Sequence, residues 1–198
     1  MFGGAPRSAV FLDRDGTLVD ELGFLDDPDQ VKLYPETGDA IRRLNEAGFF
    51  VALVTNQSGV ARGLFDEKRL SAIHTRLQQL LVRSGARIDA IAYCPHHPEE
   101  GVPPYRRECI CRKPKPGLIL KLLQEHRLDP ATSWVVGDSA RDIEAGANAG
   151  LGGRILVATG KGQSEHRALP AELRPSIEWV EDLPTAVDVI LETALQGR

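Results

Sequence analysis

An apolar run that stops abruptly at two aspartates is the feature that most constrains this chain. Residues 9–12, Ala-Val-Phe-Leu, lead directly into Asp13, and Asp15, Gly16 and Thr17 follow. A short apolar run bounded by turn residues is typical of a buried strand in a parallel sheet. Ligands of open α/β sheets bind beyond the carboxyl ends of such strands, so both aspartates are expected at a binding site. A divalent cation would keep two such close carboxylates ionised, although Asp also suits an ordinary turn.

The remainder of the chain repeats this pattern of an apolar run, a polar loop and a helix. We therefore predict an α/β fold with a doubly wound, mostly parallel, Rossmann-like sheet. A length of 198 residues suits one domain, residues 1–198, and the polar segment 20–31 is too short for a large cap. Further strands are expected at 49–54, 88–93, 134–136, 154–158 and 177–180, and helices at 35–47 and 184–195. Three more helices are expected: one capped by Asp66 with apolar positions between 70 and 81, one marked by apolar positions between 118 and 123, and an alanine-rich one that follows Asp142 and stops near Gly150. Residues 160–175 are the least structured stretch.

Polar residues with complementary chemistry follow the later strands. Thr55 follows the second strand, Lys113 the excursion after the third, and Asp138 the fourth. Taken singly, Thr55 also suits a turn, Lys113 a surface charge and Asp138 a helix N-cap. Together they suit a phosphate site, because Lys113 and Thr55 can hold phosphoryl oxygens while Asp13, Asp138 and the backbone carbonyl of Asp15 hold Mg²⁺. Asp142 is either an outer neighbour of that metal or a first-turn acid favoured by the helix dipole.

In sequence order, Asp13-x-Asp15-Gly16-Thr17, Thr55, Lys113 and Asp138 resemble the four motifs of the haloacid dehalogenase-like phosphatases. The resemblance implies that Asp13 is the nucleophile, that Asp15 is the acid and base, and that Thr55 and Lys113 complete the catalytic set. It also implies a fold with helices on both faces of the sheet.

All three cysteines of the chain fall in one short stretch with a histidine. Cys94-x-His96 and Cys109-x-Cys111 offer three sulfurs and one nitrogen, the ligand set of a closed tetrahedral zinc site. An odd number of cysteines argues against a disulfide framework. We predict a structural Zn²⁺ that holds the loop 94–111, with His97 as the alternative to His96. Because four protein ligands leave no open position, this zinc is not expected to be catalytic.

Three stretches of the sequence point to one family within this group of phosphatases. Residues 55–63, 94–98 and 109–117 are similar to the bacterial D-glycero-D-manno-heptose-1,7-bisphosphate 7-phosphatases. That family implies Mg²⁺-dependent removal of the 7-phosphate through an aspartyl phosphate, in nucleotide-activated heptose synthesis for cell-surface polysaccharide. The chain departs from the expected pattern at Phe24, where Tyr is expected, and at Ser139, where some relatives have Lys; both bear on substrate detail and leave the anomer open. The implied substrate-binding residues are Glu21, Leu22, Gly23, Phe24, Thr55, Asn56, Gln57, Ser58, Arg112, Lys113 and Ser139.

Other functions remain open at this stage. Histidinol-phosphate phosphatases share the catalytic set and a similar zinc loop, although with a shorter spacing between the ligand pairs. Polynucleotide 3′-phosphatases share the D-x-D-G-T and T-N-Q features, and a local basic run at 106–115 would suit nucleic acid. A net charge of −4 argues against that partner. A zinc-loop binding module without catalysis is the non-enzyme alternative.

We expect a small phosphorylated sugar as substrate, no nucleic-acid or membrane partner, and a monomer. A cytoplasmic location is expected since no signal-like or spanning apolar segment is present.

Overall fold

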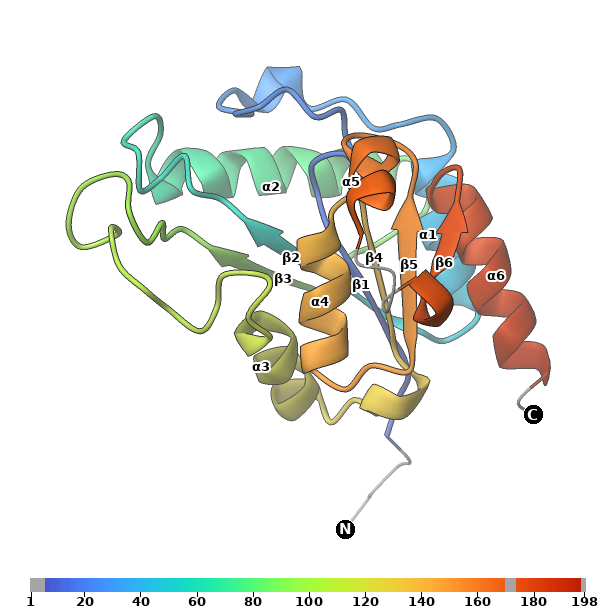
Figure 1. The fold of residues 1–198 in the computed structure, drawn as a ribbon. Helices are drawn as coiled ribbons and strands as arrows, with labels where there is room; N and C mark the ends of the chain where they lie inside the picture. The colour runs from blue at the N-terminus through green and yellow to red at the C-terminus, as the bar shows by residue number, and fades with distance from the viewer. Residues whose placement is uncertain (1–5, 170–173, 197–198) are drawn as a thin grey trace, which may run out of the picture.

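A six-stranded sheet forms the centre of the molecule, and each pair of neighbouring strands runs parallel. The computed structural model describes residues 6–169 and 174–196. The strand order is β3-β2-β1-β4-β5-β6, so the chain grows outward from β1 in both directions (Figure 1). The strands are β1 (Ala9–Leu12), β2 (Phe50–Asn56), β3 (Ala90–Cys94), β4 (Trp134–Gly137), β5 (Gly153–Val157) and β6 (Glu178–Val180).

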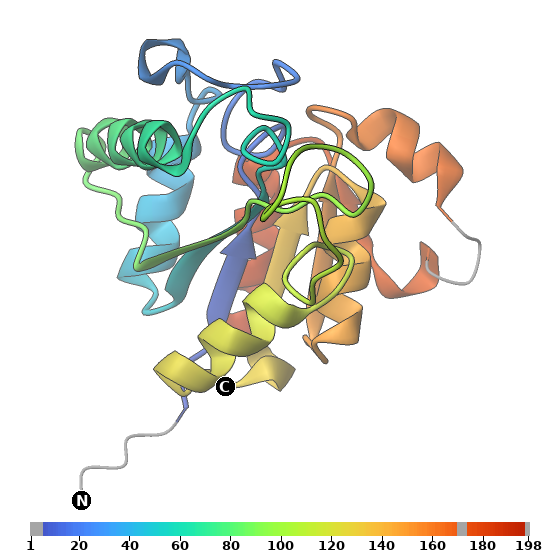
Figure 2. The ribbon, with the colours of Figure 1, turned by 90° about the vertical axis from the view of Figure 1, so that its left-hand side faces the viewer.

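Helices cover both faces of this sheet, which confirms the predicted doubly wound architecture. One face packs against α1 (Thr37–Glu46), α2 (Glu67–Val82) and α6 (Leu183–Gln196). The other face packs against α3 (Gly117–His126) and α4 (Ala140–Asn148), as Figure 2 shows from the side. A shorter helix, α5 (Gly162–Ala168), follows β5, and three 3-10 turns complete the elements at Pro28–Gln30, Pro130–Thr132 and Arg174–Ser176. Among residues 6–169 and 174–196, no segment forms a large cap over the sheet.

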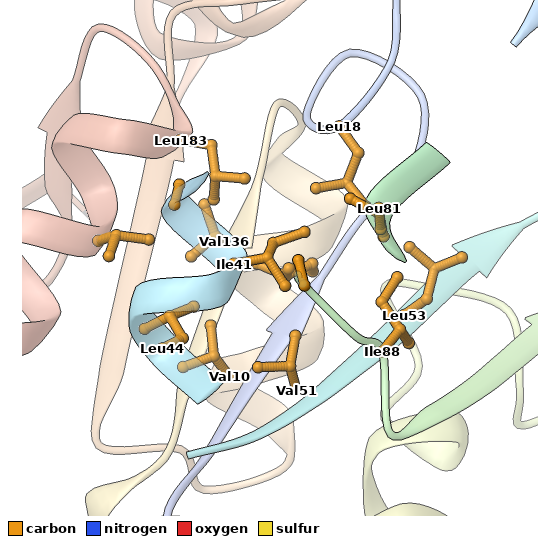
Figure 3. Close-up of a cluster of buried hydrophobic side chains, with 14 of the residues drawn as sticks. Val10, Leu18, Ile41, Leu44, Val51, Leu53, Leu81, Ile88, Val136 and Leu183 are labelled. Atoms are coloured by element: carbon orange, nitrogen blue, oxygen red, sulfur yellow. The ribbon is translucent and has the colours of Figure 1, made fainter. Parts of the chain in front are cut away.

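Strand β1 and the first five residues of β2 are apolar at every position because both of their faces are buried. Val10, Val51 and Val136 point from three neighbouring strands toward Ile41 and Leu44 of α1 (Figure 3). On the opposite face, alternate residues of β1 and β2 meet the leucine-rich side of α3 and the alanine-rich side of α4. The continuous apolar runs in the sequence are therefore the two-sided core of a parallel sheet.

Two features differ from the sequence-based expectation. Strand β2 extends through Thr55 and Asn56, because these polar residues still pair with Tyr93 and Cys94 of β3. Two of the expected loop residues thus lie on the strand itself. Helix α5 lies within the stretch from which no element was expected. Its residues carry no apolar period, and the buried Leu169 follows the helix end.

Within the described ranges, no helix combines the length and the hydropathy that a membrane crossing requires. The single-domain prediction spans residues 1–198, of which residues 1–5, 170–173 and 197–198 lie outside the described residues.

Candidate active site

The site begins where β1 ends, beside the central switch in strand order. The backbone N–H of Asp13 donates to the Val136 carbonyl, which keeps Asp13 in register with β4 one residue beyond the strand. Gly16 has a positive φ of 79°, and a Cβ at this position would lie 2.0 Å from Oδ2 of Asp138. Only glycine therefore allows the loop after β1 to approach Asp138 so closely.

Lys113 is buried in the middle of the site and is held by three oxygen atoms. Its Nζ lies 2.8 Å from Oδ1 of Asp13 and 2.5 Å from Oδ1 of Asp142, and it donates to the Val54 carbonyl at 2.7 Å. Burial alone would lower the pKa of Lys113, but the two carboxylates outweigh it and raise the pKa above its ordinary value. Lys113 is therefore a fixed positive charge beside Asp13.

Asn56 fixes the segment that carries this lysine. Its Nδ2 donates to the Lys113 carbonyl and its Oδ1 accepts from the Lys113 N–H, both at 3.1 Å. The paired hydrogen bonds tie the loop that returns from the cysteine cluster to the end of β2. Because both backbone groups of Lys113 are held, its side chain enters the site from a defined position.

Three carboxylates share the floor of the site. Oxygen atoms of Asp13, Asp138 and Asp142 all lie within 4.8 Å of one another. Burial, followed by the charge of Asp13, raises the pKa of Asp138 to about 8. Burial raises the pKa of Asp142 to about 6, although Lys113 opposes the shift. Such buried, mutually repelling carboxylates fit a bound divalent cation, which would keep them ionised.

Asp15 is not one of these three carboxylates and has partners of its own. Arg14, which is almost completely buried, donates from Nε and Nη2 to the two carboxylate oxygens of Asp15, both at 2.9 Å. Gln57 donates from Nε2 to Oδ2 of Asp15 at 2.9 Å and to the Thr55 hydroxyl at 3.0 Å. The Thr55 hydroxyl thus accepts from Gln57 and keeps its own hydrogen for another acceptor.

A cavity of about 280 Å³ opens over these groups. Of the residues implied by the resemblance, Leu22 does not line the cavity and is exposed. Ser139 lines it and also caps α4, where its hydroxyl accepts from the Arg141 N–H. The implied residues that do line it are Asp13, Asp15, Glu21, Gly23, Phe24, Thr55, Asn56, Gln57, Ser58, Arg112, Lys113, Asp138 and Ser139.

Several further charged residues line the cavity without having been assigned from the sequence. Arg62 lies with its guanidinium carbon 5.5 Å from the centre of the Phe24 ring, and it pairs with Glu100. Lys161 pairs with Glu21 at 3.2 Å. Asp142, for which the sequence left open a place near the metal or a role as first-turn acid, also lines the cavity and lies in the first turn of α4. Arg62 and Lys161 could not be recognised as site residues from the sequence, because most arginines and lysines are solvated surface charges.

The cysteine cluster assembles beside this cavity. The sulfur of Cys94 lies 3.5 Å from that of Cys109 and 3.2 Å from that of Cys111, and Nδ1 of His96 lies 3.4 Å from the Cys111 sulfur. These separations exceed a disulfide bond and suit ligands around one tetrahedral metal. The His97 ring lies outside the cluster, and its Nδ1 accepts from the N–H groups of Glu99 and Glu100.

The basic run at 106–115 does not form one surface. Lys113 is buried, whereas Lys115 pairs with Glu108 at 2.5 Å on the outside. Arg106 and Arg107 are exposed on the loop, and Arg112 is half-buried at the cavity. Burial lowers the pKa of Arg112, and the nearby charges of Arg141 and Arg62 act in the same direction. The run therefore offers no continuous track for a nucleic-acid backbone.

Comparisons with known proteins agree with this geometry. Residues 110–186 match the HAD-hydrolase-like family model. The chain is 39% identical over 183 residues to the D-glycero-beta-D-manno-heptose-1,7-bisphosphate 7-phosphatase of Yersinia pestis, covering 90% of this chain and 94% of that protein. It is 42% identical over 178 residues to the phosphatase of the same name from Vibrio cholerae, covering 90% and 95%. A D,D-heptose 1,7-bisphosphate phosphatase from B. bronchiseptica, solved with magnesium and phosphate, superposes with a TM-score of 0.83 at 38% identity and covers 94% of this chain and 99% of that one.

Proposed function

Because the chain belongs to the D-glycero-D-manno-heptose-1,7-bisphosphate 7-phosphatase family, we propose that it removes the 7-phosphate from that sugar bisphosphate. The reaction is hydrolysis of a phosphoric monoester. The names of the relatives specify the β anomer, and we extend this preference to the present chain. The product would enter the synthesis of nucleotide-activated heptose for cell-surface polysaccharide.

In the first step, a carboxylate oxygen of Asp13 attacks phosphorus while the bond to the sugar oxygen breaks. Asp15 gives its proton to the departing alkoxide. Lys113 and the free hydrogen of the Thr55 hydroxyl stabilise the charge on the transferring phosphoryl oxygens. In the second step, Asp15 takes a proton from water as the water oxygen attacks the aspartyl phosphate, and Asp13 leaves as a carboxylate.

The proton transfers require Asp15 to leave the position described above. Its carboxylate is held by Arg14 and Gln57, and its side chain is 21% exposed, so it has room to turn toward the cavity. Arg14 and Gln57 therefore hold Asp15 at the edge of the cavity before it turns toward the substrate.

The donor sets fit two metals. Asp13, Asp138 and the backbone carbonyl of Asp15 would hold Mg²⁺, which supplies positive charge that lets an anionic nucleophile approach an anionic substrate. Cys94, His96, Cys109 and Cys111 would hold a structural Zn²⁺. We propose that this zinc stiffens the loop so that Arg112 and Lys113 keep their places at the cavity.

One observation carries the proposal: Asp13, Thr55, Lys113 and Asp138 come from four separate segments and meet around one cavity. The test is phosphate release with Mg²⁺ from heptose 1,7-bisphosphate, histidinol phosphate and a 3′-phosphorylated oligonucleotide, with Asp13→Asn as the control. Strong preference for the heptose is expected. Preference for either other compound would overturn the substrate assignment while leaving the catalytic set in place, and no turnover of any compound would favour a binding module.

We further propose a monomer that acts in the cytoplasm. A sugar bisphosphate carries several negative charges and does not cross a membrane unaided, so its enzyme and its source are expected in one compartment. Light scattering during size-exclusion chromatography and fractionation of the producing cells test these two statements.

A further inference from the structure

Some of the positive charges around the cavity are paired with carboxylates and others are not. Five lysines and arginines line it: Arg62, Arg112, Lys113, Arg141 and Lys161. Lys113 is neutralised by Asp13 and Asp142, Lys161 pairs with Glu21, and Arg62 pairs with Glu100. Arg112 and Arg141 have no carboxylate at ion-pair distance among residues 6–169 and 174–196. Two unmatched guanidinium groups at one side of a cavity form a site for an anion.

These two arginines also mark where the cavity continues. A second hollow of about 250 Å³ adjoins the first, and Arg112, Lys113 and Arg141 line both. The reacting phosphate belongs at Asp13, Thr55 and Lys113. A group at the other end of the same substrate, directed toward the second hollow, would therefore pass between Arg112 and Arg141.

Both side chains are oriented by contacts of their own. Nη1 of Arg112 donates to the His96 carbonyl at 3.2 Å, which fixes its position beside the cysteine cluster. The Arg141 Nε lies 3.4 Å from the Ser139 hydroxyl, and that hydroxyl also accepts from the Arg141 backbone. Ser139 thus turns the arginine back along the start of α4. Neither contact uses a negative charge, so both guanidinium groups keep their full attraction for an anion.

We propose that Arg141, together with Arg112, binds the phosphate that the enzyme leaves intact. Arg141 is then a specificity-determining residue that makes the enzyme prefer a sugar bisphosphate to the corresponding monophosphate. This inference rests on the proposed function, since it assigns the second phosphate of that substrate. The Ser139 hydroxyl acts through Arg141 and is a positioning group.

The test compares two substrates that share the reacting phosphate, heptose 1,7-bisphosphate and heptose 7-phosphate. Steady-state kinetics are measured for the wild type, Arg141→Gln, Arg141→Lys and the matched control Arg106→Gln. The control removes the same charge from an exposed loop arginine that lines neither hollow. Circular dichroism and thermal unfolding check that each variant is folded.

We expect Arg141→Gln to lower kcat/KM for the bisphosphate by about 10- to 100-fold, chiefly through KM, and to leave the monophosphate unaffected. Arg141→Lys restores part of the preference, and Arg106→Gln keeps all of it. An unchanged preference in Arg141→Gln, or an equal loss on both substrates, overturns the assignment of Arg141. If the wild type hydrolyses neither heptose phosphate, the proposed function itself is wrong, and that result is visible before any variant is examined.

Discussion

Asp142 lies 2.5 Å from the ammonium group of Lys113, so this buried cation is shared between the carboxylates of Asp142 and Asp13. Both partners are buried, at 2% and 4% side-chain exposure. Asp142 also accepts from the Ser139 N–H with its other oxygen, which completes a reciprocal cap at the start of α4. The Asp142 side chain therefore connects the helix cap to Lys113.

Asp142→Asn removes one of the two carboxylate charges that hold Lys113. We expect kcat to fall about 10- to 100-fold, because the ammonium is drawn further toward Asp13 and away from the phosphoryl oxygens. The free energy of unfolding should fall by about 1–3 kcal/mol, since a hydrogen bond to a charged group is weakened.

A double-mutant cycle with Lys113→Met separates this coupling from the capping role of Asp142. The two changes should be strongly non-additive in kcat, whereas Asp142→Asn and an exposed change such as Arg106→Gln should be additive. If Asp142→Asn kept the wild-type kcat, Asp142 would have no role in positioning Lys113.

Asp13→Asn should abolish turnover while the protein stays folded. The amide lacks the charge and the nucleophilicity of the carboxylate, so a loss of at least about 10⁴-fold in kcat is expected. Phosphate release gives the rate, and thermal unfolding verifies the fold. Asp29→Asn, at an exposed position of a 3-10 turn, is the matched control and should retain full activity. Residual rates of Asp13→Asn close to those of the control would remove Asp13 from the nucleophile role.

The sequence identified those parts of the site that lie next to an apolar run. Asp13 and Asp138 each follow a strand and Thr55 lies near the end of one, and the parallel sheet brings strand ends to one edge. The hydrogen bonds that orient them were not predictable, because they join residues far apart in the chain. Asn56 holds the backbone of Lys113 across 57 positions, and no local pattern indicates that contact.

Charges at the rim of the cavity were the least predictable part. Arg141 follows a helix N-cap and looks like an ordinary exposed residue until the loop after β3 brings Arg112 to the same cavity. Helix α5 was not predicted from the sequence for a related reason. Its position depends on contacts such as the hydrogen bond from the Ala140 N–H to Glu165, and not on an apolar stripe. Tertiary contacts, not local propensity, decide both features.

Purified protein should carry close to one zinc per chain. Four ligand atoms lie within one cluster, and burial raises the pKa of the Cys94 thiol, so a thiolate there requires a bound cation. Elemental analysis by mass spectrometry measures the metal, and Cys109→Ser should lower both the zinc content and the melting temperature. A protein that is free of zinc and equally stable would contradict the structural role.

The two metals should be separable by chelation. Brief treatment with EDTA is expected to stop phosphate release by removing Mg²⁺, while zinc stays in its closed four-ligand site. Addition of Mg²⁺ should restore activity. If Zn²⁺ alone restored it, the roles assigned to the two donor sets would have to be exchanged.

His74 should make the folded state sensitive to mild acid. It is buried on α2 beside Tyr93, and its Nε2 has no hydrogen-bond partner among the described residues. Burial, followed by the charge of Arg14, lowers the pKa of His74 from its ordinary 6.5 to about 3. The folded state thus holds His74 neutral, while the unfolded chain takes up a proton below pH 6.5. Stability is complete above that pH and is lost progressively as the pH falls toward 3.

Urea unfolding at pH 7.5 and pH 5.5 measures this effect. At pH 5.5, one unit below the ordinary value, His74 should cost about 1.4 kcal/mol of the free energy of unfolding. His74→Leu removes the titration, so the difference between wild type and variant isolates His74 from all other groups. His126→Leu, on the exposed end of α3, serves as the matched control and should keep the wild-type pH dependence. Equal losses in wild type and His74→Leu would mean that the ring is protonated in the folded state, and the burial argument would fail.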